Sequence, residues 1–132
     1  MFKSVYIIDD DEVSAFLTEA MLTAEDFAES YQTFLNPCDA LQQILPYLLE
    51  TKPDQLPEII ILDLNMPYMN GWEFLDALEP YAYLLENYCL IYMLTSSVDV
   101  KDIRRAQEYD FLAGFLQKPI EEDIIRKILN ET

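Results

Sequence analysis

Side chains that could bind a cation or react chemically follow four apolar runs of the sequence. Three acids follow "SVYII", one acid closes "EIIILD", a hydroxyl follows "YCLIYML" and an amine follows "FLAGFLQ": Asp9, Asp10, Asp11, Asp63, Thr95 and Lys118. An ionised acid at the end of an apolar strand is costly unless an opposite charge compensates it. The position of Asp63 therefore indicates that this acid has a function.

The chemistry of this set follows from its charges. Carboxylates held close together repel one another, and a bound cation removes that repulsion. The chain has no histidine, and Cys38 and Cys89 are not at a metal-ligand spacing, so the ligands would be oxygens, which favours Mg²⁺. A carboxylate beside Mg²⁺, an ammonium and a hydroxyl is the equipment for phosphoryl transfer to an aspartate.

Secondary-structure elements must bring these side chains together, and the sequence alternates between strand and helix patterns. Short apolar runs predict strands at residues 4–8, 29–35, 58–63, 88–94 and 111–117. Helical spacing and caps predict helices at 12–25, after the Asn36-Pro37 cap, and at 71–79, 99–109 and 120–130. In the first helix, the apolar residues at helical spacing are Val13, Phe16, Leu17, Ala20 and Met21.

Glycine and proline residues set the expected element boundaries. We expect Pro46 to kink or end the second helix and Pro80 to interrupt the third. Asn70-Gly71 is typical of a hairpin turn, but the helical pattern from Trp72 onward favours a helix start there.

Strict alternation of strands and helices predicts an α/β fold with a parallel sheet and helices on both faces. Ligands of such open sheets bind beyond the carboxyl ends of the strands. The acids, the hydroxyl and the amine described above all follow strands. We therefore expect them to meet at one edge of the sheet.

Four motifs together resemble a known family over essentially the whole chain. They are "IIDDDE", "IIILDLNMPYMNGWEF", "YMLTSS" and "GFLQKPI", and they resemble the receiver domains of two-component response regulators, of the stand-alone chemotaxis type. The resemblance implies a flavodoxin-like, open doubly wound sheet of five parallel strands in the order 2-1-3-4-5, with five helices. It also implies a single receiver domain over residues 1–132.

The resemblance assigns roles to the acids and to the amine. It implies that Asp63 is the phosphoacceptor, and that Asp9 and Asp10 are the acidic pair that binds Mg²⁺ together with Asp63. Asn65 would offer its backbone carbonyl to the metal. Lys118 would pair first with Asp63 and then with the phosphoryl group.

Other positions carry the family's switch and its rate control. Thr95 would hydrogen-bond the attached phosphoryl group, and Phe115 lies where the family keeps an aromatic side chain that moves inward with that threonine. An ordinary core aromatic is the alternative interpretation of Phe115. The side chains of Asn65 and Ser97 occupy the two positions where the family varies its dephosphorylation rate. The Lys118–Pro119 peptide is expected to be cis.

The third acid in the first motif leaves one question open. Asp11 follows Asp9 and Asp10 directly, so the working pair could be Asp9 and Asp10 or Asp10 and Asp11. Strand alternation favours the first pair.

The distribution of charge along the chain limits which classes of partner are compatible with it. The net charge of −17 argues against nucleic acid, whose phosphates such a surface repels. Residues 1–97 hold 17 acidic and 2 basic residues, whereas residues 98–132 hold 8 acidic and 6 basic residues. The resemblance implies an output face on the fourth helix, the fifth strand and the fifth helix, which lie in this near-neutral segment. We expect this face, with Lys101, Arg104 and Arg105, to dock a downstream protein or a second copy of the chain after phosphorylation.

The resemblance implies a histidine kinase or a histidine phosphotransfer protein as the upstream partner, and with no histidine of its own this chain is expected only to receive the phosphoryl group. No apolar run reaches the ~18 residues of a membrane span, and the N-terminus lacks the apolar core of a secretory signal. We therefore predict a cytoplasmic protein with reduced cysteines and no membrane partner.

Two other functions would use part of the same set of residues. A haloacid-dehalogenase-type phosphatase also uses an aspartate nucleophile with Mg²⁺, but it needs a second acid two residues later, where this chain has Asn65. A degenerate receiver would bind partners without phosphorylation, although the complete set of site residues argues against it. The protein is thus expected to be a phosphoacceptor that assists its own phosphorylation and dephosphorylation rather than an enzyme.

Overall fold

Five parallel strands form the centre of the computed structural model, which describes residues 1–131. Their order in the sheet is β2-β1-β3-β4-β5, as predicted. The strands are β1 (Phe2–Ile8), β2 (Ala28–Phe34), β3 (Ile59–Asp63), β4 (Leu90–Thr95) and β5 (Leu112–Gln117). All five residues of β3 are buried, as expected for the central strand of a sheet that is covered on both faces.

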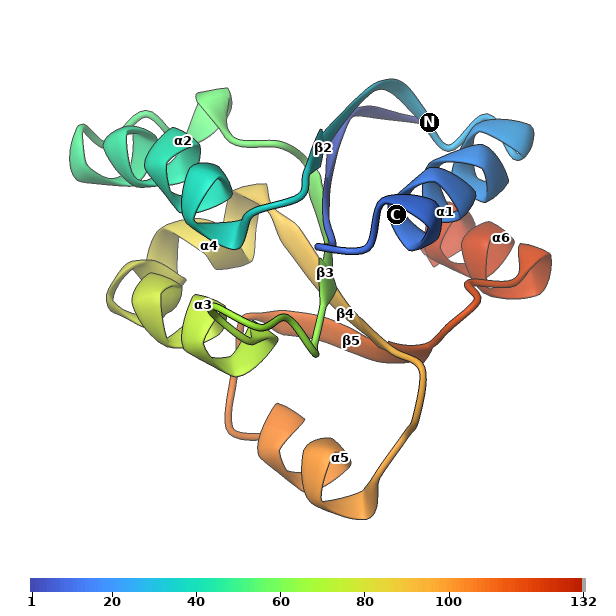
Figure 1. The fold of residues 1–132 in the computed structure, drawn as a ribbon. Coiled ribbons are helices and arrows are strands. Elements are labelled where there is room, and N and C mark those ends of the chain that lie inside the picture. The colour runs from blue at the N-terminus through green and yellow to red at the C-terminus, as the bar shows by residue number, and fades with distance from the viewer. Residues whose placement is uncertain (132) are drawn as a thin grey trace.

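Helices cover both faces of this sheet (Figure 1). They are α1 (Glu12–Ala24), α2 (Pro37–Leu49), α3 (Gly71–Leu78), α4 (Ala82–Tyr88), α5 (Val100–Ala106) and α6 (Glu122–Glu131). The sheet separates two hydrophobic clusters: α1 and α6 pack in one, and α2, α3 and α4 pack in the other. The flavodoxin-like α/β fold predicted from the sequence is confirmed.

Side-chain caps fix where the helices begin. Asp11 accepts hydrogen bonds from two backbone N–H groups of α1, and Asn36 and Asp99 each accept one at the starts of α2 and α5. Asn70 and Glu73 form a reciprocal capping box at the start of α3. The Asn70-Gly71 pair therefore starts a helix, as the pattern after it predicted, and is not a hairpin turn.

The two proline predictions were only partly correct. Pro46 does not end α2, which continues to Leu49. Pro80 does interrupt the third helical segment, but a 3-10 turn (Glu79–Tyr81) follows and the chain becomes helical again in α4, a helix that the sequence interpretation missed. A proline in the first turn of a helical segment loses no hydrogen bond, so the chain can resume helix after it. As a result β4 begins at Leu90 rather than at residue 88.

Most of the apolar residues whose spacing predicted α1 do not face the sheet, although Met21 is partly buried against the core. Val13, Phe16 and Leu17 are 68%, 69% and 53% exposed. The buried residues of α1 are instead Ala15, Thr18 and Leu22, of which Thr18 is polar. Because apolar residues lie on both sides of this helix, periodicity alone could not identify the buried side.

Candidate functional site

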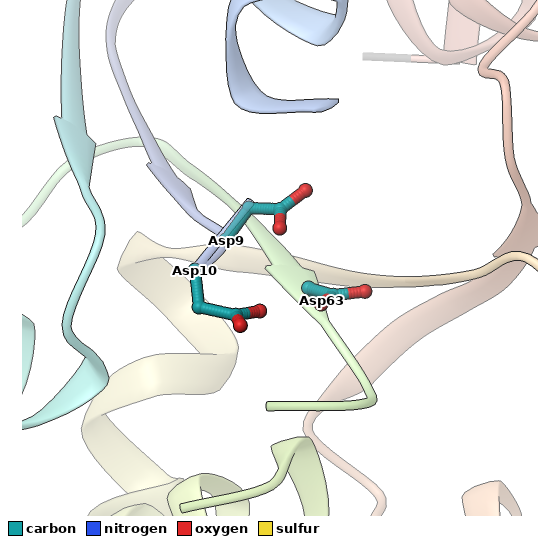
Figure 2. Close-up of side chains that lie close together, drawn as sticks. All are labelled: Asp9, Asp10 and Asp63. Carbon is teal, nitrogen blue, oxygen red and sulfur yellow. The ribbon is translucent and has the colours of Figure 1, made fainter. Parts of the chain in front are cut away.

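The sheet register brings three carboxylates to the carboxyl ends of β1 and β3. Ile8 pairs with Leu62 in neighbouring parallel strands, so the residues that follow, Asp9 and Asp63, emerge side by side. Together with Asp10 they offer one oxygen each within 4.8 Å of one another. Figure 2 shows the three side chains extending to the same side of the strand ends. Asp9 and Asp63 are buried and Asp10 is exposed.

Asp11 does not belong to this cluster. Its carboxylate accepts hydrogen bonds from the backbone N–H groups of Val13 and Ser14, at 3.0 and 3.2 Å, and so caps α1. The acids that cluster with Asp63 are Asp9 and Asp10, so the geometry favours this pair over Asp10 and Asp11.

Lys118 joins the strand ends across the site. Its ammonium nitrogen lies 2.8 Å from Asp9 Oδ2 and 3.0 Å from Asp63 Oδ1. It also donates a hydrogen bond of 2.8 Å to the hydroxyl of Ser14, which the sequence interpretation did not include. The spacing gave no signal for Ser14, since its contact joins residues 104 positions apart.

Burial and charge change the acidity of the site. The pKa of Asp63 is raised to about 6: burial is the main cause, the negative charges of Asp9 and Asp10 add to it, and Lys118 opposes it. The pKa of Lys118 is raised by its carboxylate partners, Asp9 first, although burial alone would lower it. The ammonium therefore stays charged, and one cation compensates a cluster of three acids only in part.

This donor set fits a hard divalent cation. Three carboxylates with oxygens within 4.8 Å, one of them exposed to solvent, are the ligands that Mg²⁺ prefers. Asp9, Asp10 and Asp63 would hold the ion. A bound Mg²⁺ would supply the positive charge that neutralises phosphoryl oxygens at this site.

The residues at the ends of β4 and β5 lie in the same edge but make other contacts. The Thr95 hydroxyl donates to the backbone carbonyl of Ser97, at 3.1 Å, and accepts from the Ser97 N–H, at 3.3 Å. The backbone N–H of Lys118 donates to the Thr95 carbonyl, which ties the two strand ends together. The Lys118–Pro119 peptide is cis, as predicted. Asn65 is exposed in the loop after β3.

An aromatic stack connects α3 with β5 and with the loop that precedes β5. Trp72, in the first turn of α3, is nearly parallel to Phe115 of β5 and to Tyr109, with ring centroids 6.1 and 5.7 Å away. The Arg105 guanidinium of α5 lies 5.1 Å from the Trp72 ring centroid, and the Tyr109 hydroxyl donates to Asp76 of α3. The sequence placed Phe115 near the site but gave no indication of its stacking partner.

Comparison with protein families gives a match over most of the chain. Residues 5–130 match the family described as "Response regulator receiver domain". The chain belongs to this receiver family. A receiver domain is a phosphoacceptor module of two-component signalling and not an enzyme in the ordinary sense.

Solved structures of other receivers share the fold. A two-component response regulator from Cytophaga hutchinsonii is 28% identical, with a TM-score of 0.86 over 98% of this chain and 96% of that chain. A response regulator receiver protein from Dyadobacter fermentans is 27% identical, with a TM-score of 0.81 over 98% and 96%. The Vibrio cholerae chemotaxis protein CheY4 is 23% identical, with a TM-score of 0.69 over 99% and 98%, which shows the fold alone.

A comparison with curated protein sequences gave no match. Within residues 1–131, no helix combines the length and the apolar character needed to cross a bilayer. The receiver family implies a histidine kinase as partner.

Proposed function

We propose that Asp63 accepts a phosphoryl group from a phosphohistidine of a histidine kinase or phosphotransfer protein. An oxygen of the Asp63 carboxylate attacks phosphorus, the bond from phosphorus to the donor nitrogen breaks, and the freed imidazole nitrogen keeps the electron pair. The observation that carries this proposal is the contact of Lys118 with Asp63 beside the cluster of three acids. Asp9 and Asp10 complete the proposed cation site, together with the backbone carbonyl of Asn65.

After transfer, the contacts at the site must change. The Lys118 ammonium now pairs with a phosphoryl oxygen in place of the Asp63 carboxylate. Thr95 gives up its hydrogen bond to Ser97 and donates to the phosphoryl group, and Phe115 of β5 moves inward as Thr95 is drawn toward that group. Because Phe115 stacks on Trp72, this movement also changes the surroundings of that indole ring. The side chains at positions 65 and 97 set the lifetime of the phosphoryl group in this proposal.

Incubation with acetyl phosphate and Mg²⁺ tests the proposal. Intact mass should increase by one phosphoryl group, and beryllium fluoride with Mg²⁺ should change Trp72 fluorescence, since Trp72 is buried in the stack. Asp63→Asn should abolish the mass gain. If the wild-type chain gains no mass and shows no optical change, the protein is a degenerate receiver that works without phosphorylation.

We infer that the upstream partner docks on the exposed apolar face of α1. Val13 and Leu17 line a cavity of about 420 Å³ that also includes Lys118 and Pro119, so this face borders the phosphorylation site. Contiguous exposed apolar side chains are typical of protein-binding surfaces. Phe16, which is 69% exposed on the same helix, extends the surface.

Substitution of Phe16 separates docking from chemistry. Phe16→Ser should slow phosphotransfer from a phosphohistidine protein and leave the rate with acetyl phosphate unchanged, because the small donor needs no docking surface. Equal slowing with both donors would instead mean that the substitution disturbs the fold. The exposed Tyr83, on α4, provides a matched control in Tyr83→Ser.

The downstream partner, or a second copy of the chain, is proposed to bind the face of α5, β5 and α6. Lys101 and Arg104 are exposed on α5, and Val100 and Ile103 add exposed apolar area. Arg105 also contacts Trp72, so its substitution would disturb the stack as well as the surface. Reversal of Lys101 and Arg104 to glutamate should weaken association of the beryllium fluoride form, measured by sedimentation. An unchanged association would place the interface elsewhere.

Three further assignments remain predictions. They are that residues 1–132 act as one domain, that the receiver is of the stand-alone chemotaxis type, and that it works in the cytoplasm. Both cysteines are free, which agrees with a reducing compartment.

A further inference from the structure

Ser14 contacts Lys118 from outside the strand ends that form the proposed site. It lies in the first turn of α1, and its hydroxyl oxygen is 2.8 Å from the Lys118 ammonium nitrogen. Its own backbone is held at both ends: Asp11 accepts a hydrogen bond from its N–H, and its carbonyl accepts one from the Thr18 hydroxyl, at 3.0 Å. The cap of α1 therefore fixes the position from which this hydroxyl reaches the lysine.

The ammonium of Lys118 has three N–H groups and three acceptors within 3.0 Å. Two acceptors are the carboxylates of Asp9 and Asp63, and the third is the neutral hydroxyl of Ser14. A neutral acceptor orients a cation without neutralising its charge. A hydrogen bond to a charged group is also stronger than one between neutral groups.

We propose that Ser14 is a positioning residue, which holds the Lys118 ammonium in place while its partner changes from the Asp63 carboxylate to a phosphoryl oxygen. This inference rests on the proposed function, because it concerns the lysine that would stabilise the transferred group. Asp63 changes chemically during transfer, whereas the hydroxyl of Ser14 does not. With Ser14 present, the long lysine side chain keeps two of its three contacts, those with Asp9 and Ser14, throughout the reaction.

Two substitutions at this position test the proposal. Ser14→Ala removes the acceptor and should slow phosphorylation by acetyl phosphate roughly tenfold, the size expected for one hydrogen bond to a charged group. Ser14→Thr keeps the hydroxyl and should restore the rate. The added methyl group has room, because Ser14 lines the cavity between α1 and Pro119. Ser30→Ala, on exposed strand β2, is the control for loss of a remote serine hydroxyl.

A spectroscopic measurement separates positioning from a general effect on folding. With ¹⁵N-labelled lysine, the ammonium resonance of Lys118 should be observable in the wild type and in Ser14→Thr, because all three N–H groups are bonded. In Ser14→Ala it should broaden through exchange with water. Wild-type rates and an unchanged ammonium resonance in Ser14→Ala would overturn the inference and leave the phosphoacceptor function intact. Failure of the wild type to gain a phosphoryl group would instead refute the proposed function itself.

Discussion

Asp63 is both buried and close to other acids, and in an unliganded protein both conditions disfavour the ionised form of its carboxylate. It is 7% exposed at the end of the most buried strand, and it faces two other acids. Lys118 compensates part of this charge, yet the pKa of Asp63 is still raised to about 6. The same burial that disfavours the ionised form also keeps water away from the carboxylate, which strengthens its interaction with any cation that binds.

The raised pKa predicts how stability depends on pH in metal-free protein. Between its ordinary pKa of 3.8 and about 6, Asp63 binds its proton more tightly in the folded state than in the unfolded state. The contribution of this proton to folding stability is therefore fully present below pH 3.8 and is lost as the pH rises through about 6. The Asp63→Asn variant has no titrating group at this position. The difference between its unfolding free energy and that of the wild type should therefore grow in favour of the variant as pH rises, by at most about 3 kcal/mol.

Urea unfolding in the presence of EDTA measures this difference. The gap between the variant and the wild type should be small near pH 4 and constant above about pH 7. A gap that is equal at both ends of this range would mean that Asp63 titrates as an ordinary exposed acid.

At the scale of elements, α3 lies very close to the end of β3. The Gly71 N–H donates to the Leu64 carbonyl at 2.8 Å. A Cβ atom at Gly71 would lie 3.1 Å from both the Asp63 carbonyl oxygen and the Leu64 Cα, and 2.9 Å from Met93 Cε. The methionine can rotate away, but the two backbone atoms cannot. The glycine is thus needed for space, since its φ is not positive.

Gly71→Ala should therefore push α3 away from the acceptor strand. We expect it to lower the free energy of unfolding by about 1–3 kcal/mol, the usual cost of overpacking, and to slow phosphorylation of Asp63. Chemical unfolding and the acetyl phosphate assay measure the two effects. Met93→Ala in the same chain should recover only part of the loss. Full recovery would show that the methionine, and not the backbone, limits the approach.

The elements also show what the sequence could predict and what it could not. Alternating strands and helices fixed the sheet and the edge at which Asp9, Asp63 and Lys118 meet, because parallel strands end on the same side. The cap made by Asp11 and the contact of Ser14 with Lys118 depend on how α1 is oriented over the sheet. That orientation was not readable, since apolar residues lie on both sides of the helix. The stack on Trp72 joins three separate segments, and no local pattern signals such a contact.

At the scale of the whole molecule, negative charge dominates. The net charge is −17, and only near the C-terminal third do basic residues approach the number of acidic ones. Folding concentrates this charge, so any salt should stabilise the protein by screening. A specific cation at Asp9, Asp10 and Asp63 should add stability beyond screening.

This distinction can be measured by comparing Mg²⁺ with Na⁺ at equal ionic strength. About 5 mM MgCl₂ should raise the melting temperature more than about 15 mM NaCl, since binding to the folded state alone contributes about 2.7 kcal/mol at a hundred times Kd. Asp10→Asn should remove the difference between the two salts and keep the response to NaCl. Equal responses of the wild type to both salts would argue against the metal site.

The contact of Arg105 with Trp72 has a consequence for any protein that binds α5. Thermodynamic linkage works in both directions: if occupancy of the strand-end site shifts the indole and the guanidinium above it, then a ligand that holds the guanidinium in one place must alter the affinity of that site by the same factor. A bound target would in this way act as an effector of its own regulator, and would change how tightly the domain holds Mg²⁺ or beryllium fluoride.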